Sequence, residues 1–468
     1  MTRRSFAQEE VDRFGWLSGD VNPIHVDPVA ARRMIFNRPV VHGIMLIGWV
    51  LECQMGQLAR SGARLRTMTA LFIGPVPVGD EVTLETDGAW PALRFRIICG
   101  GAVVARGSIG FEESSAADAI PVGQLAAPRG PAELDRSAFA SAKGEERLEI
   151  GSGFEILFPA LAARLPHWQI AVLTALTRIV GMHCPGLNSI LSEIDIRFEA
   201  QPAPTIGWKV GEFDDRFGRL SLDLVSTSVT GTVIAFERPV AGGARPQAGI
   251  LSSIGPREFA HFKPLIVGAT RGMGGVLTRL LVAGGARVVG TFNMGSADAA
   301  TLVEELKSGP GQCRFEKLDI FDRDTTNIRR IIAGSAGFSH LFYTATPPIF
   351  VGTSGVVSND LFEHFLEAYV GSFLRLFETL EAGGPTLAGV FFPSSAAVQD
   401  HQPGLAEYAM AKAAAEAMIA ALAARHRKIQ FLAPRLPRLD TDQTINRAGV
   451  AADDPAPLAL ALLRQFRS

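Results

Sequence analysis

Residues 40–59, VVHGIMLIGWVLECQMGQLA, constrain the fold more than any other segment of this chain. The run is long enough for a helix, and apolar residues would occupy nearly every side of it. Four segments with strand-like alternation follow, which read TMTALFIGPV, EVTLETDGAW, LRFRIICGG and AVVARGSIGFEE. A helix without a polar face needs cover on all sides, so we expect a curled sheet wrapped around it.

The same order recurs later in the chain. PHWQIAVLTALTRIVGM is a second long apolar segment, and SEIDIRFEA, GWKVGEFDD, RLSLDLVSTSV and TVIAFERPV follow it as alternating segments. The repeated plan predicts a pseudo-dimer of two helix-in-sheet halves.

The last part of the chain alternates between strand and helix patterns instead. PLIVGAT, ARVVGTF, CRFEKLDI, SHLFYTA and LAGVFFPSS are predicted strands, and helical patterns lie between them. Such alternation is typical of an α/β, doubly wound parallel sheet.

Length and composition divide the chain. A length of 468 residues favours about three domains. Two stretches rich in Ala, Gly, Ser and Pro are predicted linkers, at 116–147 and 241–259. The predicted units are therefore residues 1–115, 148–240 and 260–468.

Charge and cysteine content exclude some functions. The net charge is −2, from 45 basic and 47 acidic residues, which gives no reason to expect nucleic acid or an acidic membrane as a partner. The four cysteines form no metal-binding or CxxC spacing, so we expect incidental thiols in a reducing cytoplasm; they are Cys53, Cys99, Cys184 and Cys313. The charged N-terminus is not a signal peptide, and no apolar run reaches membrane-spanning length.

The segment SGDVNPIHVD, Ser18–Asp27, places a carboxyl group and an imidazole on one loop. Taken singly, Asp20 after a glycine is commonly a turn residue, and His25 before a helix is commonly a satisfied surface or core group. Asp27 before Pro28 is expected to cap a helix rather than to catalyse.

The segment FGWLSGDVNPIHVDPVAA, with VVHGIML and FIGPVPVGDEVTL after it, resembles the MaoC-like (R)-specific enoyl-CoA hydratases, which have the hot-dog fold. This resemblance covers about the first 110 residues. It implies an α+β double hot-dog architecture for the first two units and makes Asp20 and His25 the catalytic pair. It also implies an acyl thioester of coenzyme A or of an acyl carrier protein as substrate.

The chemistry of hydration supports this choice. Adding water across a C2=C3 bond beside a thioester needs a base for the water and an acid for C2. We expect His25 to polarise the water and Asp20 to manage the C2 proton. Backbone N–H groups near His42 and Gly43, at the start of the following helix, would receive the oxyanion; a structural role for the His42 side chain stays open.

The middle unit has no comparable loop. Its segment GMHCPGLNSILSEIDIRF looks like the non-catalytic half of double hot-dog proteins, so we expect it to be structural. His183 and Cys184 alone do not make a metal site, and we expect no metal in the chain.

The third unit carries a glycine-rich turn, GATRGMGG, between a predicted strand and a helix. Its spacing resembles the short-chain dehydrogenase/reductases with a Rossmann fold, and glycines there let a backbone approach a pyrophosphate. The second strand ends without an acidic residue and Arg271 lies in the turn, which favours NADPH over NADH, although Arg271 can also be a solvated loop charge. The resemblance implies cofactor contacts from Gly268, Thr270, Arg271, Gly272, Met273, Gly274, Asp319, Ala345, Tyr408 and Lys412, and a homo-oligomer formed through this domain.

Three later residues match the catalytic triad of that family. Tyr408 follows Ser395 by thirteen positions and precedes Lys412 by four, so Tyr408 and Lys412 share a helix face. Tyr408 would protonate the forming alkoxide, Ser395 would hold the carbonyl oxygen, and the charge of Lys412 would lower the pKa of Tyr408. The chain departs from the family at Ala368, where the relay asparagine is expected, and at Tyr343-Thr344-Ala345-Thr346, where the family has Asn-Asn-Ala-Gly.

Together the motifs predict a bifunctional enzyme of fatty acid or polyketide metabolism. It would reduce 3-oxoacyl thioesters to (R)-3-hydroxyacyl thioesters and would reversibly hydrate 2-enoyl thioesters. Two alternatives stay open: a hydratase whose degenerate reductase domain is a nucleotide-binding or partner scaffold, and a reductase with an inert hot-dog half.

Overall fold

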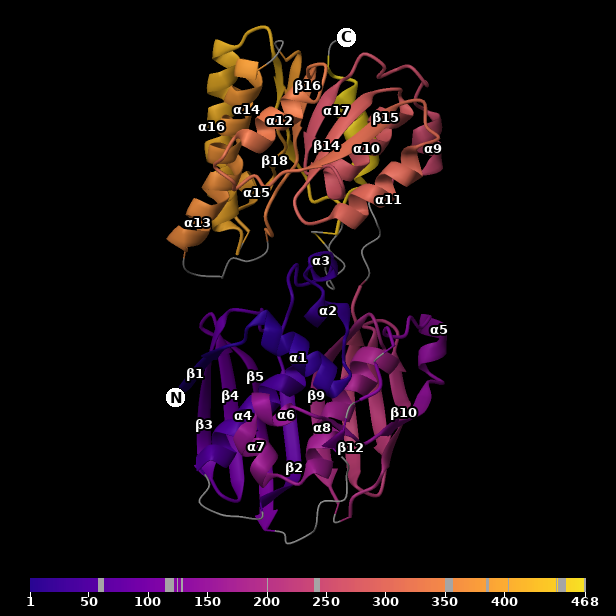
Figure 1. The fold of residues 1–468 in the computed structure, drawn as a ribbon, viewed down its shortest axis with the longest axis vertical. Coiled ribbons are helices and arrows are strands. Elements are labelled where there is room, and N and C mark those ends of the chain that lie inside the picture. The colour runs from indigo at the N-terminus through magenta and orange to yellow at the C-terminus, as the bar shows by residue number, and fades with distance from the viewer. Residues whose placement is uncertain are drawn as a thin grey trace. The chain divides into compact units, whose positions relative to one another are not determined.

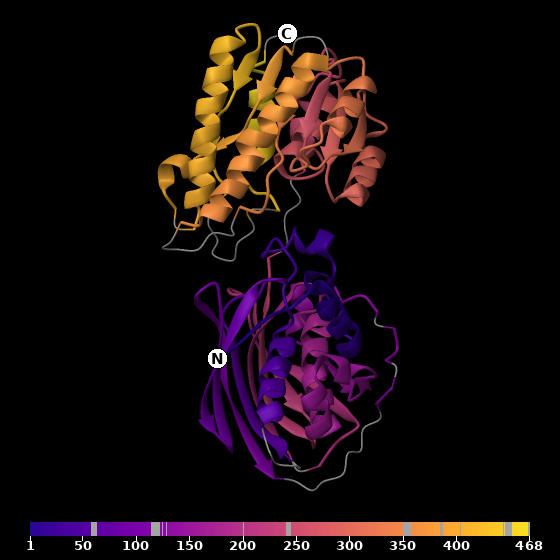
Figure 2. The same ribbon diagram turned by 60° about the vertical axis from the view of Figure 1, so that its left-hand side comes forward.

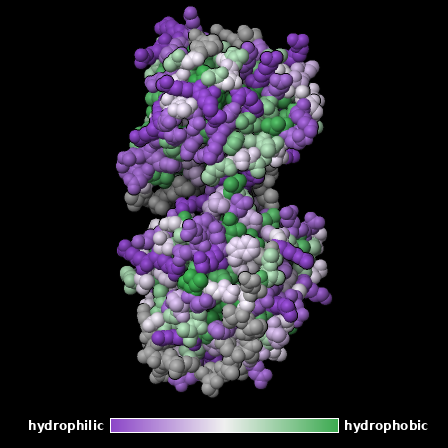
Figure 3. Space-filling view, viewed as in Figure 1, coloured by the Kyte–Doolittle hydropathy of each residue, from purple (hydrophilic) through white to green (hydrophobic). Residues whose placement is uncertain are grey.

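The computed structural model describes residues 1–57, 63–113, 122–123, 125–127, 129–199, 201–239, 245–349, 357–383, 387–402, 404–442, 444 and 452–466. The chain forms two compact units, Met1–Val240 and Ala241–Ser468 (Figure 1). Polar side chains cover much of the face of each unit that Figure 3 shows. Within the described ranges, no helix combines the length and the apolar character that a membrane crossing needs.

One antiparallel sheet of ten strands runs through the first unit, in the order β1-β3-β4-β5-β2-β9-β12-β11-β10-β7. Strands β2 and β9 join the two halves, with pairs from Thr67↔Arg197 to Leu71↔Glu193. The strands are β1 Thr2–Ser5, β2 Ala63–Phe72, β3 Glu81–Ala89, β4 Ala92–Cys99, β5 Ala102–Glu113, β7 Lys143–Arg147, β9 Ser189–Phe198, β10 Thr205–Asp214, β11 Arg219–Val225 and β12 Val229–Glu237.

Two apolar helices lie against this sheet, α4 at Gly43–Gln57 and α8 at His167–Arg178 (Figures 1 and 2). Every residue of α8 after His167 is buried, and α8 continues into a π-helix, η1, at Ile179–His183. The predicted double hot-dog arrangement is confirmed. Smaller elements of this unit are α1 Gln8–Ser18, α2 Pro23–Val26, α3 Pro28–Ala31, α5 Arg136–Phe139, α6 Phe154–Leu157 and α7 Pro159–Arg164, with a short ladder of β6 Val122–Gly123 and β8 Ile150–Gly151.

The two edge strands of this sheet, β1 and β7, were not predicted from the sequence. Strand β1 pairs with β3, and β7 pairs with β10 although its residues lie in the predicted linker 116–147. Their sequences, TRRS and KGEER, contain no apolar residue, and most of their residues are exposed. An edge strand with little buried surface gives no alternating pattern to detect, and charged residues are favoured there.

The second unit has a parallel sheet in the order β15-β14-β13-β16-β17-β19. In chain order this is 3-2-1-4-5-6, the Rossmann arrangement, so the predicted doubly wound sheet is confirmed. The strands are β13 Pro264–Val267, β14 Arg287–Phe292, β15 Gln312–Lys317, β16 His340–Tyr343, β17 Gly389–Phe391 and β19 Gln430–Leu432, and β18 Ser394–Ser395 pairs with β20 Arg435–Leu436.

Two hydrophobic cores belong to this unit. One contains buried residues of α12, α13, α14 and α16, and the other contains buried residues of α10 and α17. The helices are α9 Ala248–Ser252, within the predicted linker 241–259, α10 Gly272–Ala283, α11 Ser296–Leu306, α12 Thr326–Ala333, α13 Asn359–Leu366, the π-helix η2 Glu367–Gly371, α14 Ser372–Gly383, α15 Ala397–Asp400, α16 Ala406–Arg425 and α17 Pro455–Leu463. All four cysteines are free thiols, as expected, and burial raises the pKa of Cys184 to about 12.

A buried glutamine fastens α8 to the sheet. The side-chain amide of Gln169 donates to Leu65 O and accepts from Leu65 N, both at 2.7 Å. These backbone groups lie beside a register shift in the β2–β5 pairing, so Gln169 supplies bonds that the ladder leaves unmade there.

We therefore predict that Gln169→Leu lowers the unfolding free energy of the first unit by roughly 2–5 kcal/mol, because two buried polar groups lose their partners. Urea unfolding measures this. Thr174→Val on the same helix is the control, since its hydroxyl donates to Ala171 O one turn away in α8 itself. Equal stability of the two variants would contradict the role of Gln169.

Candidate functional sites

Short capped elements place Asp20 and His25 on one loop of the first unit. Helix α1 ends at Gly19, whose φ of 74° is left-handed and suits glycine. Helix α2 begins after Asn22, whose side chain accepts from Ile24 N at 3.2 Å, and Pro23 occupies its first position. Asp27 caps α3 through Val29 N and Ala30 N, as its position before Pro28 predicts.

The carboxyl group of Asp20 is buried and accepts two hydrogen bonds. Oδ2 accepts from Thr177 Oγ1 at 2.6 Å, and Oδ1 accepts from Asn22 N at 3.2 Å. Burial raises the pKa of Asp20, and the nearby His25 and the Thr177 hydroxyl oppose this rise without cancelling it. The acid form of Asp20 therefore persists to higher pH than that of an exposed aspartate.

His25 makes its own bond to the backbone. Its Nδ1 lies 2.7 Å from Val40 O, and since that carbonyl can only accept, the geometry assigns the proton to Nδ1. Nε2 of a neutral ring is then an acceptor. Burial lowers the pKa of His25 more than the Asp20 charge raises it, which favours this neutral form.

His42 contacts both members of this pair. Its ring stacks on that of His25, with 3.7 Å between centroids and 23° between planes, and its Nε2 lies 2.9 Å from Asp20 O. Burial holds the pKa of His42 well below its ordinary value. Its Nδ1 has no hydrogen-bond partner among the described residues. The sequence analysis left a structural role open for this side chain, and its contacts support one.

The side chains of Asp20, His25 and His42 place ligand-type atoms within 4.8 Å of one another. A metal bound to two imidazoles lies about 2.0–2.1 Å from each nitrogen and in the plane of each ring. Stacked rings send their lone pairs side by side rather than toward one point. The arrangement therefore suits a water molecule better than a metal ion.

The second half of the first unit completes this loop. The amide of Asn22 donates to Gly181 O at 2.9 Å and to Gly186 O at 3.1 Å. Arg178 donates to Ser18 O at 2.5 Å and to Glu146 Oε1 at 2.6 Å. Gly181, Gly186 and Arg178 lie about 160 positions from the loop and carry no motif, so they could not be predicted as its partners from the sequence.

Gly43 begins α4 immediately after His42. The first N–H groups of a helix have no partners within it, so this turn offers donors and the positive end of the helix dipole. A Cβ at Gly43 would lie 3.0 Å from the Phe72 ring, which explains the glycine. The predicted oxyanion site is therefore at a helix N-terminus, although its contact with a ligand stays a prediction.

The glycine-rich turn of the second unit connects β13 to α10. Gly268 and Gly272 have left-handed φ values of 83° and 52°. A Cβ at Gly268 would lie 2.8 Å from the Ala345 backbone, and a Cβ at Gly274 would lie 2.1 Å from Gly268 O. Thr270 and Met273 belong to this turn and to the start of α10. The glycines bring three backbone segments together at the carboxyl end of the sheet.

Arg271 is partly buried and has an acidic partner in this structure. Its Nη1 donates to Asp442 Oδ2 at 2.7 Å, and Asp442 is largely buried. This partner lies 171 positions away and was not predicted. Asp319 follows β15, and its Oδ1 accepts from Phe321 N at 3.0 Å, so it also orders a turn.

Ser395, Tyr408 and Lys412 meet near β18 and α16. A hydrogen bond from Ser395 lowers the pKa of Tyr408, but burial has the larger effect and raises it. This balance is the reverse of the lowering by Lys412 that we expected. Lys412 Nζ donates to Pro393 O at 2.7 Å and is otherwise surrounded by rings, at 4.0 Å from the Tyr369 centroid and 4.9 Å from that of Phe392.

Burial lowers the pKa of Lys412 to about 7, which explains why its influence on Tyr408 is weak. The negative charge of Glu416 opposes this lowering, and the carbonyl and aromatic neighbours of Lys412 also favour its charged form.

All three tyrosines of the chain lie in this region. Tyr343 OH donates to Ala368 O at 2.6 Å, and Tyr369 OH lies 2.5 Å from Thr346 Oγ1. Ala368 and Tyr369 belong to the π-helix η2, and π-helical turns are frequent at functional sites. The departures noted in the sequence thus take part in two neighbouring hydrogen bonds.

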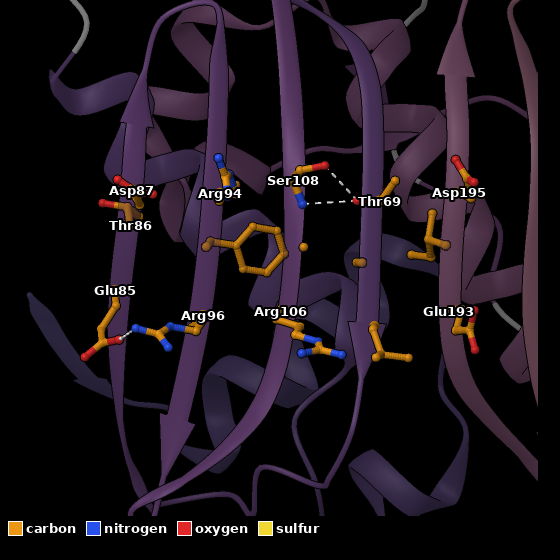
Figure 4. A pocket seen from close by; sticks show the side chains of 15 residues that line it. Thr69, Glu85, Thr86, Asp87, Arg94, Arg96, Arg106, Ser108, Glu193 and Asp195 are labelled. Atoms are coloured by element: carbon orange, nitrogen blue, oxygen red, sulfur yellow. Dashed lines mark hydrogen bonds and ion pairs between the residues drawn. The ribbon is translucent and has the colours of Figure 1, made fainter.

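A separate hollow of about 710 Å³ lies on the sheet of the first unit (Figure 4). Arg94, Arg96 and Arg106 line it between acidic residues of β3 and β9, and the helices lie behind the sheet in this view. Arg96 pairs with Glu85 at 2.8 Å. None of the residues that line this hollow belongs to the two candidate sites.

Comparison with known proteins identifies the N-terminal part. The family model described as MaoC like domain matches residues 1–96. These residues are a MaoC-like domain. An (R)-specific enoyl-CoA hydratase from Aeromonas caviae is 39% identical over 84 residues, which are 18% of this chain and 63% of that enzyme. The peroxisomal multifunctional enzyme type 2 of Drosophila melanogaster is 30% identical over 83 residues, 18% of this chain and 14% of that protein.

The alignments of the MaoC-like domain thus span less than two thirds of these relatives. For the second unit, a short-chain dehydrogenase/reductase from Serratia marcescens has a TM-score of 0.40 at 19% identity, over 44% of this chain and 90% of that one. A similarity this distant says nothing about chemistry, so the activity of the second unit must be argued from its own residues.

Proposed function

We propose that this chain is a bifunctional enzyme of acyl thioesters. Its MaoC-like domain would interconvert 2-enoyl and (R)-3-hydroxyacyl groups, and its second unit would reduce 3-oxoacyl groups with NADPH. The buried Asp20–His25 pair is the observation that carries the proposal, because burial moves the two pKa values in the directions that an acid and a base need. The names of the relatives support the same substrate class.

The hydration step follows from the two protonation states. Nε2 of neutral His25 takes a proton from water, whose oxygen then bonds to C3 of the enoyl group. The protonated carboxyl of Asp20 gives its proton to C2, and the proton on His25 afterwards returns to Asp20. Negative charge on the thioester oxygen is stabilised by N–H groups at the start of α4.

The second unit fits a dinucleotide. Gly268 and Gly274 allow the turn between β13 and α10 to close tightly, because a Cβ at either position would meet neighbouring backbone. Helix α10 begins at this turn, and its N-terminus would receive a pyrophosphate. NADPH would supply a hydride when bound. Tyr408 would then give its proton to the carbonyl oxygen, while Ser395 holds that oxygen and Lys412 contributes positive charge.

A scaffold function of the second unit remains a second candidate, because Ala368 offers no side-chain group where a relay asparagine is expected. The scaffold would bind NADPH without oxidising it in the presence of a 3-oxoacyl thioester. The intact Ser395, Tyr408 and Lys412 favour the reductase.

The first prediction concerns hydration. Asp20→Asn or His25→Ala should slow hydration of crotonyl-CoA by about 10²–10⁴, because each removes one proton-transfer group. Loss of absorbance of the enoyl thioester measures the rate. Asp87→Asn, in the hollow of Figure 4, is the control and should keep full activity. Rates close to wild type in both site variants would refute the assignment.

The second prediction concerns the cofactor. NADPH should bind more tightly than NADH, because a 2′-phosphate can replace Asp442 as the partner of Arg271. Asp442→Asn should increase the preference for NADPH by roughly tenfold or more, and Arg271→Ala should remove it. Fluorescence titration of both reduced cofactors measures the affinities. Tighter binding of NADH to the wild type would show the argument wrong.

The third prediction concerns reduction. Acetoacetyl-CoA with NADPH should give (R)-3-hydroxybutyryl-CoA and some crotonyl-CoA, because both sites then act on one alcohol. Tyr408→Phe keeps the ring but removes the proton donor, so both products should disappear while hydration of crotonyl-CoA continues. Chiral chromatography of the products decides. An S alcohol, or full reduction by the variant, would contradict the proposal.

A further inference from the structure

Thr177 brings a hydroxyl from the second half of the first unit to the reactive loop of the first half. It is the penultimate residue of α8 and is 4% exposed. Its Oγ1 donates to Asp20 Oδ2 at 2.6 Å, across 157 positions of sequence. That distance is at the short end of the range for O–H···O hydrogen bonds, which indicates a well-formed bond.

The Thr177 bond is the shorter of the two that hold the carboxyl group. The other comes from Asn22 N at 3.2 Å, within the same loop. A backbone donor two residues away restrains the carboxyl group only locally. Thr177, on a buried helix, ties it to the opposite half, so the orientation of the acid depends on the packing of α8.

The backbone of Gly181 also lies against the Asp20 carboxyl group. It lies four positions after Thr177, in η1, and a Cβ there would lie 2.3 Å from Asp20 Oδ1 and 2.6 Å from Oδ2. No side chain fits in that space. Gly181 O also accepts from the Asn22 amide, so the same helical turn holds both Asp20 and the residue two positions after it.

We propose that Thr177 is a positioning residue for hydration: its hydroxyl holds the Asp20 carboxyl group against Gly181 in the orientation that proton transfer to C2 requires. The half without an acid/base loop then takes part in the chemistry of the other half. This inference rests on the proposed hydratase function and names a residue that neither the motifs nor the comparisons assign.

Three variants test the proposal. Thr177→Val keeps the shape and removes the hydroxyl, Thr177→Ser keeps the hydroxyl, and Thr174→Val makes the same change one turn earlier, away from Asp20. Hydration of crotonyl-CoA is followed as kcat, KM and the pH profile of kcat/KM. Circular dichroism and thermal melting establish that each variant is folded.

Thr177→Val should lower kcat by about 10–100-fold with little change in KM, because the acid is misplaced while the substrate contacts remain. The limb of the pH profile that Asp20→Asn abolishes should move to higher pH, since the lost bond opposes the effect of burial on the pKa of Asp20. Thr177→Ser should restore both properties, and Thr174→Val should match the wild type.

Wild-type kcat and an unmoved pH profile in folded Thr177→Val would overturn the proposal, as would a Thr177→Ser variant no better than Thr177→Val. If Thr177→Val does not fold, Thr177→Ala removes the hydroxyl without adding bulk, and the same readouts decide. A wild-type chain that fails to hydrate crotonyl-CoA refutes the proposed function itself, whereas an active wild type with an indifferent Thr177→Val refutes only this inference.

Discussion

A buried carboxyl group needs hydrogen-bond partners, and the arrangement of the first unit follows from how Asp20 obtains them. Asp20 is 1% exposed, and an isolated charge at such a depth would cost many kcal/mol. Its own loop supplies one weak backbone donor, and α8 of the other half supplies the strong one. The two halves must therefore pack in one register for Asp20 to keep the Thr177 hydrogen bond. The β2–β9 ladder and the bonds of Gln169 to Leu65 hold that register.

The second unit contains a buried cationic group, Lys412, which also needs partners for its charge. Lys412 is buried among aromatic rings and has a carbonyl partner at 2.7 Å, and the charge of Glu416 also favours its ammonium. Its pKa near 7 shows that this stabilisation is incomplete. The hydrogen-bonded hydroxyl groups of Tyr369 and Thr346 lie at the same place, since Lys412 Nζ is 4.0 Å from the Tyr369 ring centroid.

Local patterns predicted much of this, and long-range contacts did not. The helix-in-sheet repeat and the glycine-rich turn contain their information within short windows, so both architectures followed from the sequence. Thr177 and Asp442 were missed because each acts on a residue about 160–170 positions away and resembles any other helix or loop residue. Strands β1 and β7 were missed because edge strands with exposed charged residues lack alternation. The effect of Lys412 on Tyr408 was misjudged because burial, which decides it, is not visible in spacing.

The two long helices of the first unit explain why its two halves, which share one fold, contribute differently to the candidate site. Helix α4 begins at Gly43, next to His42, so its positive end and its unpaired N–H groups lie near the reactive loop. Helix α8 instead continues into η1, and this helical segment approaches Asp20 with the Thr177 side chain and the Gly181 backbone. Burial raises the pKa of Asp20, while the positive end of α4 favours negative charge on a thioester oxygen. The two similar helices thus contribute through different parts, an N-terminus in one half and a side chain with a close backbone approach in the other.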